Sequence, residues 1–130
     1  MSGSFAAQLA EFQASTMGKG HAVVREVVEE AGRRLIERSP IDTGRFKSNW
    51  YYGLETRDTR TSEQTGVRTL NNLEEMPSKP AGFIHYISNS LPYGPALERG
   101  SSKQAPQGMV GLTIVEWPQV VAEALRRVNP

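Results

Sequence analysis

Apolar residues recur at helical spacing between His21 and Arg38, and they predict the longest helix of the chain. Ser39-Pro40 ends this helix, because the residue before a proline avoids the helical region. The predicted buried stripe is Val24, Val27, Val28, Ala31 and Leu35. The charged residues Glu26, Glu29, Glu30, Arg33, Arg34 and Glu37 cover the rest of the surface.

A shorter amphipathic helix is predicted near the N-terminus, where Ser4 can cap a segment in which Phe5, Leu9 and Phe12 share one face. The pattern weakens near Thr16. The two phenylalanines need a docking partner, because chain ends fray unless they are tied down. That partner is either the core of the same chain or a neighbouring subunit.

The period changes from helical to alternating at Arg45, after a predicted turn over residues 40–44 in which Gly44 can take a positive φ. Phe46, Ser48 and Trp50 alternate with Lys47, Asn49 and Tyr51, which predicts a strand over residues 45–54. The same alternation predicts a second strand over residues 83–89. An antiparallel sheet of these strands can keep one face against helices.

The polar residues 55–80 predict a long exposed loop or an extended hairpin. Within it, Val67 and Leu70 mark a brief candidate strand, and Leu73 to Met76 a single helical turn. After the second strand, Pro92 and Gly94 supply turn chemistry, and a helical turn over residues 96–99 is closed by Gly100 as a C-cap. The polar residues 101–107 then have no obvious partner within so small a domain.

The last predicted element is a helix that runs to the C-terminus with a kink at Pro118. The alternative is a strand over residues 112–116, with Pro118 in the first helical position. The apolar positions at helical spacing are Val110, Thr113, Ile114, Trp117, Val121, Ala124, Leu125 and Val128. Together the elements predict one α+β domain over residues 1–130, with long N-terminal helices, a small antiparallel sheet and a C-terminal helix packed on the sheet.

The composition offers no general attraction to nucleic acid or to a membrane. The 130 residues include 15 basic and 14 acidic ones, for a net charge of +1. The absence of cysteine excludes disulfides and thiolate chemistry and fits a reducing compartment. The N-terminal residues lack the pattern of a signal peptide, and no apolar run reaches the length of a membrane span.

Side chains capable of catalysis do not form a recognisable constellation. His21 and His85 are the only histidines, and neither has metal-ligand spacing to a second ligand. Glu116 and Glu123 are predicted to lie on a solvated helix face. The serines at positions 88, 90, 101 and 102 lie in no nucleophile-elbow context. We therefore expect no enzymatic activity, no metal and no cofactor.

A basic cluster near the first turn raises the alternative of nucleic-acid binding. It comprises Arg33, Arg34, Arg38, Arg45 and Lys47, with Trp50, Tyr51 and Tyr52 nearby as stacking groups. Acidic residues are interleaved with these arginines, and we therefore expect no specific nucleic-acid binding.

Assembly with other proteins is the function class that the residues favour, because aromatic side chains and arginine are enriched at interfaces. For Trp50 and Trp117 the alternative is that both are core residues that hold the sheet to a helix. The candidate interface residues are Phe5, Phe12, Tyr51, Tyr93, Leu97, Glu98, Arg99, Ser101, Ser102, Lys103 and Gln104.

Two blocks of the chain carry a family resemblance. The first is Ser39-Pro40-Ile41-Asp42-Thr43-Gly44-Arg45-Phe46, followed by Ser48-Asn49-Trp50. The second comprises Ile87-Ser88-Asn89, Pro92-Tyr93, Leu97-Glu98-Arg99-Gly100, Gln104-Ala105-Pro106 and Gly108-Met109-Val110. In this order and at this separation they resemble the small neck and tail-completion proteins of long-tailed phages, the class of the lambda-like minor tail protein Z. Residues 55–80 and Pro118 depart from the pattern.

The resemblance implies a structural virion protein at the head–tail junction, assembled in the host cytoplasm. Such a protein completes the tail and joins the tail tube to the neck, as a ring of copies that matches the sixfold tube. The implied partners are other copies of the chain in a hexameric ring, together with tail terminator, tail tube or head-connector proteins. The alternative within the same virion is that this chain is itself the tail terminator that caps the tube.

Overall fold

A computed structural model describes residues 19–41, 43–100 and 108–129. The predicted N-terminal helix with Phe5 and Phe12, and the candidate interface residues Ser101, Ser102, Lys103 and Gln104, lie outside these ranges. In chain order the elements are α2 (Lys19–Arg38), η1 (Lys47–Asn49), β1 (Tyr51–Leu54), η2 (Leu73–Glu75), β2 (His85–Ser88), α3 (Gly94–Glu98), α4 (Val110–Val115) and α5 (Trp117–Val128).

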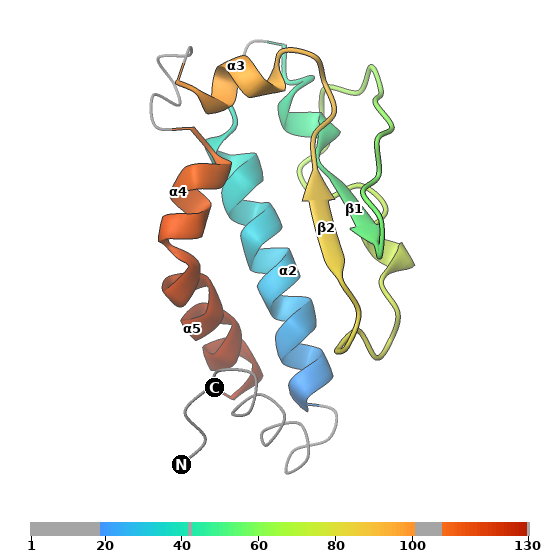
Figure 1. The fold of residues 1–130 in the computed structure, drawn as a ribbon, viewed down its shortest axis with the longest axis vertical. Helices are drawn as coiled ribbons and strands as arrows, with labels where there is room; N and C mark the ends of the chain where they lie inside the picture. Colours follow the sequence, from blue (N-terminus) through green and yellow to red (C-terminus); the bar gives the residue numbers. More distant parts are fainter. Residues whose placement is uncertain (1–18, 42, 101–107, 130) are drawn as a thin grey trace.

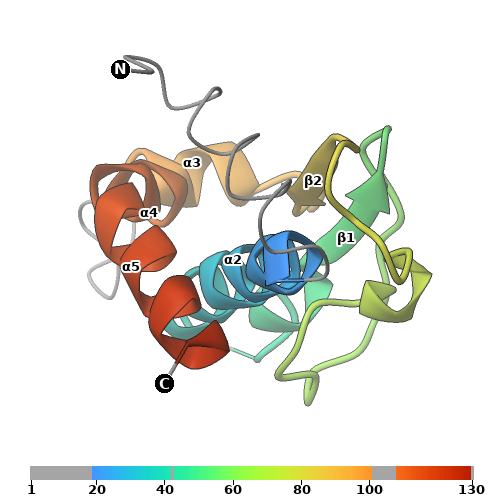
Figure 2. The ribbon, with the colours of Figure 1, turned by 90° about the horizontal axis from the view of Figure 1, so that it is seen from below.

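The described elements form an α+β fold in which helices pack on one face of a small sheet. Figure 1 shows α2 in the middle of the molecule, with the sheet on one side and α4 and α5 on the other. The view from below shows the same order (Figure 2). The short helix α3 lies across one end. The α+β class predicted from the sequence is confirmed.

The central helix α2 is held by apolar side chains on two faces. Val28, Leu35 and Ile36 are at most 6% exposed and belong to the hydrophobic core. The helix ends where predicted, at Arg38 before Ser39-Pro40, and the Ser39 hydroxyl donates a hydrogen bond back to the Leu35 carbonyl oxygen. This bond occupies one of the carbonyl oxygens that every helix C-terminus leaves without a partner.

The sheet consists of β1 and β2, paired antiparallel with Tyr52 opposite Ile87 and Gly53 opposite Tyr86. The predicted strand over residues 45–54 is wrong in its first half, because Lys47–Asn49 form a 3₁₀ turn and the strand begins at Tyr51. The predicted second strand over residues 83–89 is shorter than expected, with bounds His85–Ser88.

Residues 55–80 follow the outer face of the sheet as a long, largely exposed loop, as predicted. The helical turn expected near Leu73 is confirmed as η2. No strand forms at Val67 and Leu70 in this part of the described chain. Instead Leu70 is buried, and Asn71 forms an isolated bridge to Tyr51 at the edge of β1.

The C-terminal segment is helical, but it is two helices with a break at Glu116, whose φ is −89° and ψ is 9°. The prediction of helix rather than strand before Pro118 is therefore confirmed, but the predicted kink at Pro118 is wrong, because the break lies at Glu116 and a separate helix begins after it. Pro118 lies in the first turn of α5, where its missing N–H breaks no helical hydrogen bond. The alternative that both tryptophans are core residues is confirmed for Trp50, which is 3% exposed. It is wrong for Trp117, which is 44% exposed.

Candidate partner interface

The two motif blocks meet at the end of the molecule beside α3. The Phe46 ring lies 5.7 Å from the Tyr93 ring and 5.8 Å from the Trp50 ring, centroid to centroid. The side-chain amide of Asn89 donates a hydrogen bond of 2.8 Å to the Phe46 carbonyl oxygen. Trp50 Nε1 donates to the Ser39 hydroxyl at 2.7 Å. Residues far apart in the sequence thus build one aromatic unit, and Tyr93 at its outer edge is 43% exposed.

The Glu98 side chain connects the end of α3 to the start of α4, the two described parts of the chain that flank residues 101–107. Its carboxylate accepts backbone hydrogen bonds from Met109 and Val110 at 2.9 Å and from Gly111 at 2.8 Å. Burial raises the pKa of the Glu98 carboxyl, but these three bonds outweigh it, so the pKa lies below its ordinary value. The carboxylate also complements the positive end of α4. Glu98 is therefore committed to holding Arg99 and Gly108 near each other.

The first motif block anchors the long loop against the sheet. Asn49 is fully buried, and its side-chain amide bonds to the backbone N–H and carbonyl oxygen of Ser62. The Ser48 hydroxyl accepts a bond of 3.0 Å from the Val67 backbone N–H. Gly44, at φ +89°, lies against the Thr65 carbonyl oxygen, where a Cβ atom would collide. Residues of the first motif block therefore hold the long loop in place. The alternating pattern of residues 46–50 reflects these contacts to the loop and not a strand.

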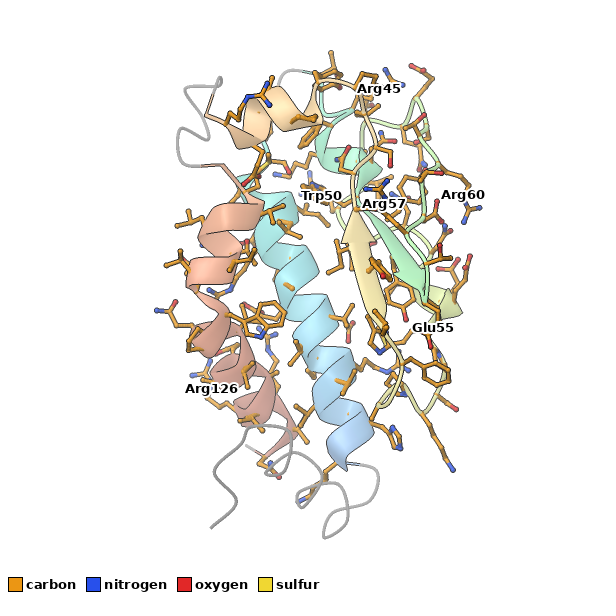
Figure 3. The ribbon with its side chains drawn as sticks, viewed as in Figure 1. Arg45, Trp50, Glu55, Arg57, Arg60 and Arg126 are labelled. Atoms are coloured by element: carbon orange, nitrogen blue, oxygen red, sulfur yellow. The ribbon has the colours of Figure 1, made fainter. Side chains whose placement is uncertain are left out.

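This loop covers Tyr51, which was a predicted interface residue. Tyr51 is 6% exposed, and the Arg60 guanidinium lies 6.0 Å from the centre of its ring. Arg60 is held by Asp58, and the Arg60 hydrogen bonds lower the pKa of the Asp58 carboxyl to about 2. Figure 3 shows Arg45, Arg57 and Arg60 on this loop side of the molecule. The placement of Tyr51 on a free surface is wrong, because the alternating pattern gave no sign of the loop over it.

The arginines of the basic cluster on α2 are paired with carboxylates. Glu30 is 5% exposed and bonds to Arg33, to Arg34 at 2.7 Å and to Arg127 at 2.8 Å. Burial raises the pKa of Glu30, but its arginine partners bring the net pKa below the ordinary value. Arg34 also bonds to Glu116 at 2.7 Å. These ion pairs tie α2 to the segment between α4 and α5 and to α5 itself, so Arg34 belongs to a structural network.

Glu116 and Glu123 do not lie on the solvated face that the sequence predicted. Glu116 bonds to Arg34 and Arg38, and Glu123 pairs with Arg126 and Arg127. Sequence reasoning missed the pairing of Glu116, because Arg34 and Arg38 lie 82 and 78 positions away from it along the chain.

Both histidines serve as hydrogen-bonding groups in the fold. His85 Nδ1 lies 2.7 Å from the hydroxyl of fully buried Tyr52, and Nε2 lies 2.8 Å from the Pro80 carbonyl oxygen. The second contact requires a proton on Nε2, so the Tyr52 hydroxyl donates to Nδ1. His21 Nδ1 accepts a bond from the Ala81 backbone N–H. Among residues 19–41, 43–100 and 108–129, no group of histidine and acidic side chains is arranged to hold a metal ion.

Of the predicted interface residues within the described chain, Tyr93 and Arg99 are exposed at the α3 end, and Leu97 packs partly against the core. Sequence reasoning did not identify the exposed apolar side chains of α4 and α5, although their helical spacing was visible. The interface role of Tyr93, Leu97 and Arg99 stays a prediction.

No protein-family model, no curated protein and no solved structure matches the chain. None of the helices in the described ranges is both long and apolar enough to cross a lipid bilayer.

Proposed function

We propose that this chain is a structural virion protein of a long-tailed phage, acting at the head–tail junction to complete the tail and join it to the neck. The observation that carries the proposal is the meeting of the two resemblance blocks in one unit. Phe46 and Trp50 of the first block pack with Tyr93 of the second, and Asn89 bonds across to Phe46. A resemblance spread over distant residues gains weight when those residues share one structural task.

The shape of the α3 end supports an assembly role. The Glu98 carboxylate holds the two sides of the segment 101–107 together, and Tyr93 and Arg99 are exposed beside it. Binding residues commonly lie on connections that a folded scaffold positions. In a ring, each copy offers different surfaces to its two neighbours, and the contact closes because the rotation closes. We propose a hexameric ring in which the α3 end contacts a neighbouring copy or the tail.

The direct test is to remove this chain from the phage that encodes it and to examine the particles by electron microscopy. The proposal predicts filled heads and tails of normal length that stay separate. Overlong tubes would identify the chain as a tail terminator instead. Joined, infectious particles would overturn both roles.

Point variants separate the surface from the fold. Arg99→Glu and Tyr93→Ala are expected to lower the yield of joined particles while leaving the far-UV circular dichroism unchanged. The matched control is Lys79→Glu, the same charge reversal at an exposed residue near the N-terminal end of α2. Equal loss of joining in the control would show that the α3 end has no special role.

A further inference from the structure

The helices α4 and α5 carry more apolar surface than the core uses. Their buried side packs against α2 and includes Thr113, Val120 and Ala124, each at most 3% exposed. A second series, at spacings of four, three and eight residues, is exposed. Its members are Val110 at 40%, Ile114 at 63%, Trp117 at 44% and Leu125 at 39%.

These four residues, called the α4–α5 stripe below, follow one side of the two helices. A spacing of four residues keeps Val110 and Ile114 on one side of α4, and a spacing of eight keeps Trp117 and Leu125 on one side of α5. Half-buried Val121 fills the gap between Trp117 and Leu125. A contiguous apolar strip that includes a tryptophan is unusual on the free surface of a soluble monomer and marks a contact site. Neither observation depends on a role in a virion.

The chain itself supplies a segment of matching pattern next to the stripe. Lys19 Nζ, at the start of α2, bonds to Asn129 Oδ1 at the end of α5 with a distance of 3.1 Å. The eighteen residues that precede Lys19 are therefore tethered at a point beside the C-terminal end of α5. Within them Phe5, Leu9 and Phe12 repeat at spacings of four and three, as the stripe does.

The lengths also agree. A helix over residues 5–16 would be about 18 Å long, and the stripe from Ile114 to Leu125 spans about 16 Å at 1.5 Å per residue. Residues 17 and 18 remain as the connection to α2, and two to five residues are typical of a connection between antiparallel helices. Phe12 would then lie near Leu125, and Phe5, about 10 Å further along the helix, near Trp117.

We propose that residues 5–16 dock as an amphipathic helix on the α4–α5 stripe of the same chain. Docking within the chain is favoured over docking on a second copy, because a short tether gives a millimolar or higher effective concentration. The α4–α5 stripe is thus a binding surface for the chain's own N-terminal segment. Of the two partners that the sequence left open for Phe5 and Phe12, this assigns the same chain.

Cross-linking of the full chain tests the proposal, since the protein contains no cysteine. In the double variant Phe12→Cys/Leu125→Cys, a short bismaleimide is expected to link the two sites within one chain, at a yield that dilution does not change. The matched control is Phe12→Cys/Arg126→Cys, because Arg126 pairs with Glu123 away from the stripe. Linked dimers that vanish on dilution would assign the stripe to a second copy, and a yield no higher than the control would leave it uncovered. Either result overturns the proposal.

A second measurement does not depend on cysteine chemistry. In the protein labelled with fluorotryptophan, the ¹⁹F resonance of Trp117 is expected to show a small solvent isotope shift. In the variant Leu9→Ser/Phe12→Ser, this isotope shift is expected to be at least twice as large. Trp50, buried at 3%, is the internal reference and should not change. A Trp117 shift already equal to that of free tryptophan in the unsubstituted chain would overturn the proposal.

Discussion

Removing the Glu98 carboxylate is predicted to destabilise the protein at the α3 end. The carboxylate accepts three backbone hydrogen bonds, from Met109, Val110 and Gly111. In Glu98→Ala, water can replace the partner of exposed Val110 and Gly111, but Met109 is 1% exposed. Loss of a capping side chain costs about 0.5–2 kcal/mol, and an unsatisfied buried N–H costs about 1–3 kcal/mol. We therefore expect a loss of about 1–3 kcal/mol.

The loss can be read as a change in melting temperature. An unfolding entropy of about 2.1 cal/mol/K per residue gives about 0.27 kcal/mol/K for this chain, so the midpoint should fall by about 4–11 °C. Glu98→Gln keeps one acceptor oxygen but turns its amide N–H₂ toward a backbone N–H. The melting temperature of this variant should fall by about half as much as that of Glu98→Ala. The matched control is Glu37→Ala, an exposed glutamate on α2, which should leave the melting temperature within about 1 °C.

The same carboxylate gives the prediction a pH dependence. Its folded pKa lies below the ordinary value of 4.5, so the stabilisation is complete above that pH and is lost as the pH falls through the lowered folded pKa. The difference in unfolding free energy between the unsubstituted chain and Glu98→Gln should therefore shrink on acidification below pH 4.5. Equal stabilities of the two proteins near neutral pH would refute the assigned capping role.

Three further substitutions test the anchors of the fold. Glu30→Gln should cost about 2–3 kcal/mol in a urea titration, less than the about 3–5 kcal/mol of a fully buried pair because Arg127 is 35% exposed; no change would contradict the tie between α2 and α5. Asn49→Ala should cost about 2–4 kcal/mol and speed amide hydrogen exchange at Ser62, because a fully buried amide loses its bonds to the loop; unchanged exchange would contradict the anchor. Asp58→Asn should lose stability relative to the unsubstituted chain at neutral pH but not near pH 2, where Asp58 itself becomes protonated, and the same loss at both pH values would contradict the Arg60 pairing.

The sequence predicted the elements whose signals are local. The valines of α2 predicted a helix that starts within two residues of its observed start, and Ser39-Pro40 predicted its end at Arg38. Gly44 and Gly100 were predicted as turn and cap residues, and both have positive φ. These features depend on the conformational limits of single residues, which no distant contact has to supply.

Long-range contacts decided the features that the sequence did not predict. Residues 46–50 alternate like a strand, but Ser48 and Asn49 turn their side chains to the long loop, and the backbone winds into a 3₁₀ turn. Apolar spacing on α5 could not show which of two apolar sides is buried. The structure buries the side with Val120 and Ala124, because small side chains allow close approach to α2, and leaves Trp117 outside.

The predicted interface residues also divide into those whose exposure follows from local sequence and those whose burial depends on contacts elsewhere in the fold. Tyr93 and Arg99 are exposed as expected, since turn residues seldom bury their side chains. Tyr51 is covered, because the loop that follows β1 folds back and brings the Arg60 guanidinium to 6.0 Å from the centre of its ring. Glu98 is exposed in part but committed to the backbone of α4, a role that only the return of the chain at Met109 reveals.

The most direct measurement of the central claim is a cryo-electron microscopy map of the neck of the virion that contains this chain. The account predicts a closed ring between tail tube and head, with the α3 end, including Tyr93 and Arg99, in contact with a neighbouring copy or with the tail. A map in which this chain is missing from the junction, or in which Tyr93 and Arg99 face only solvent, would contradict it.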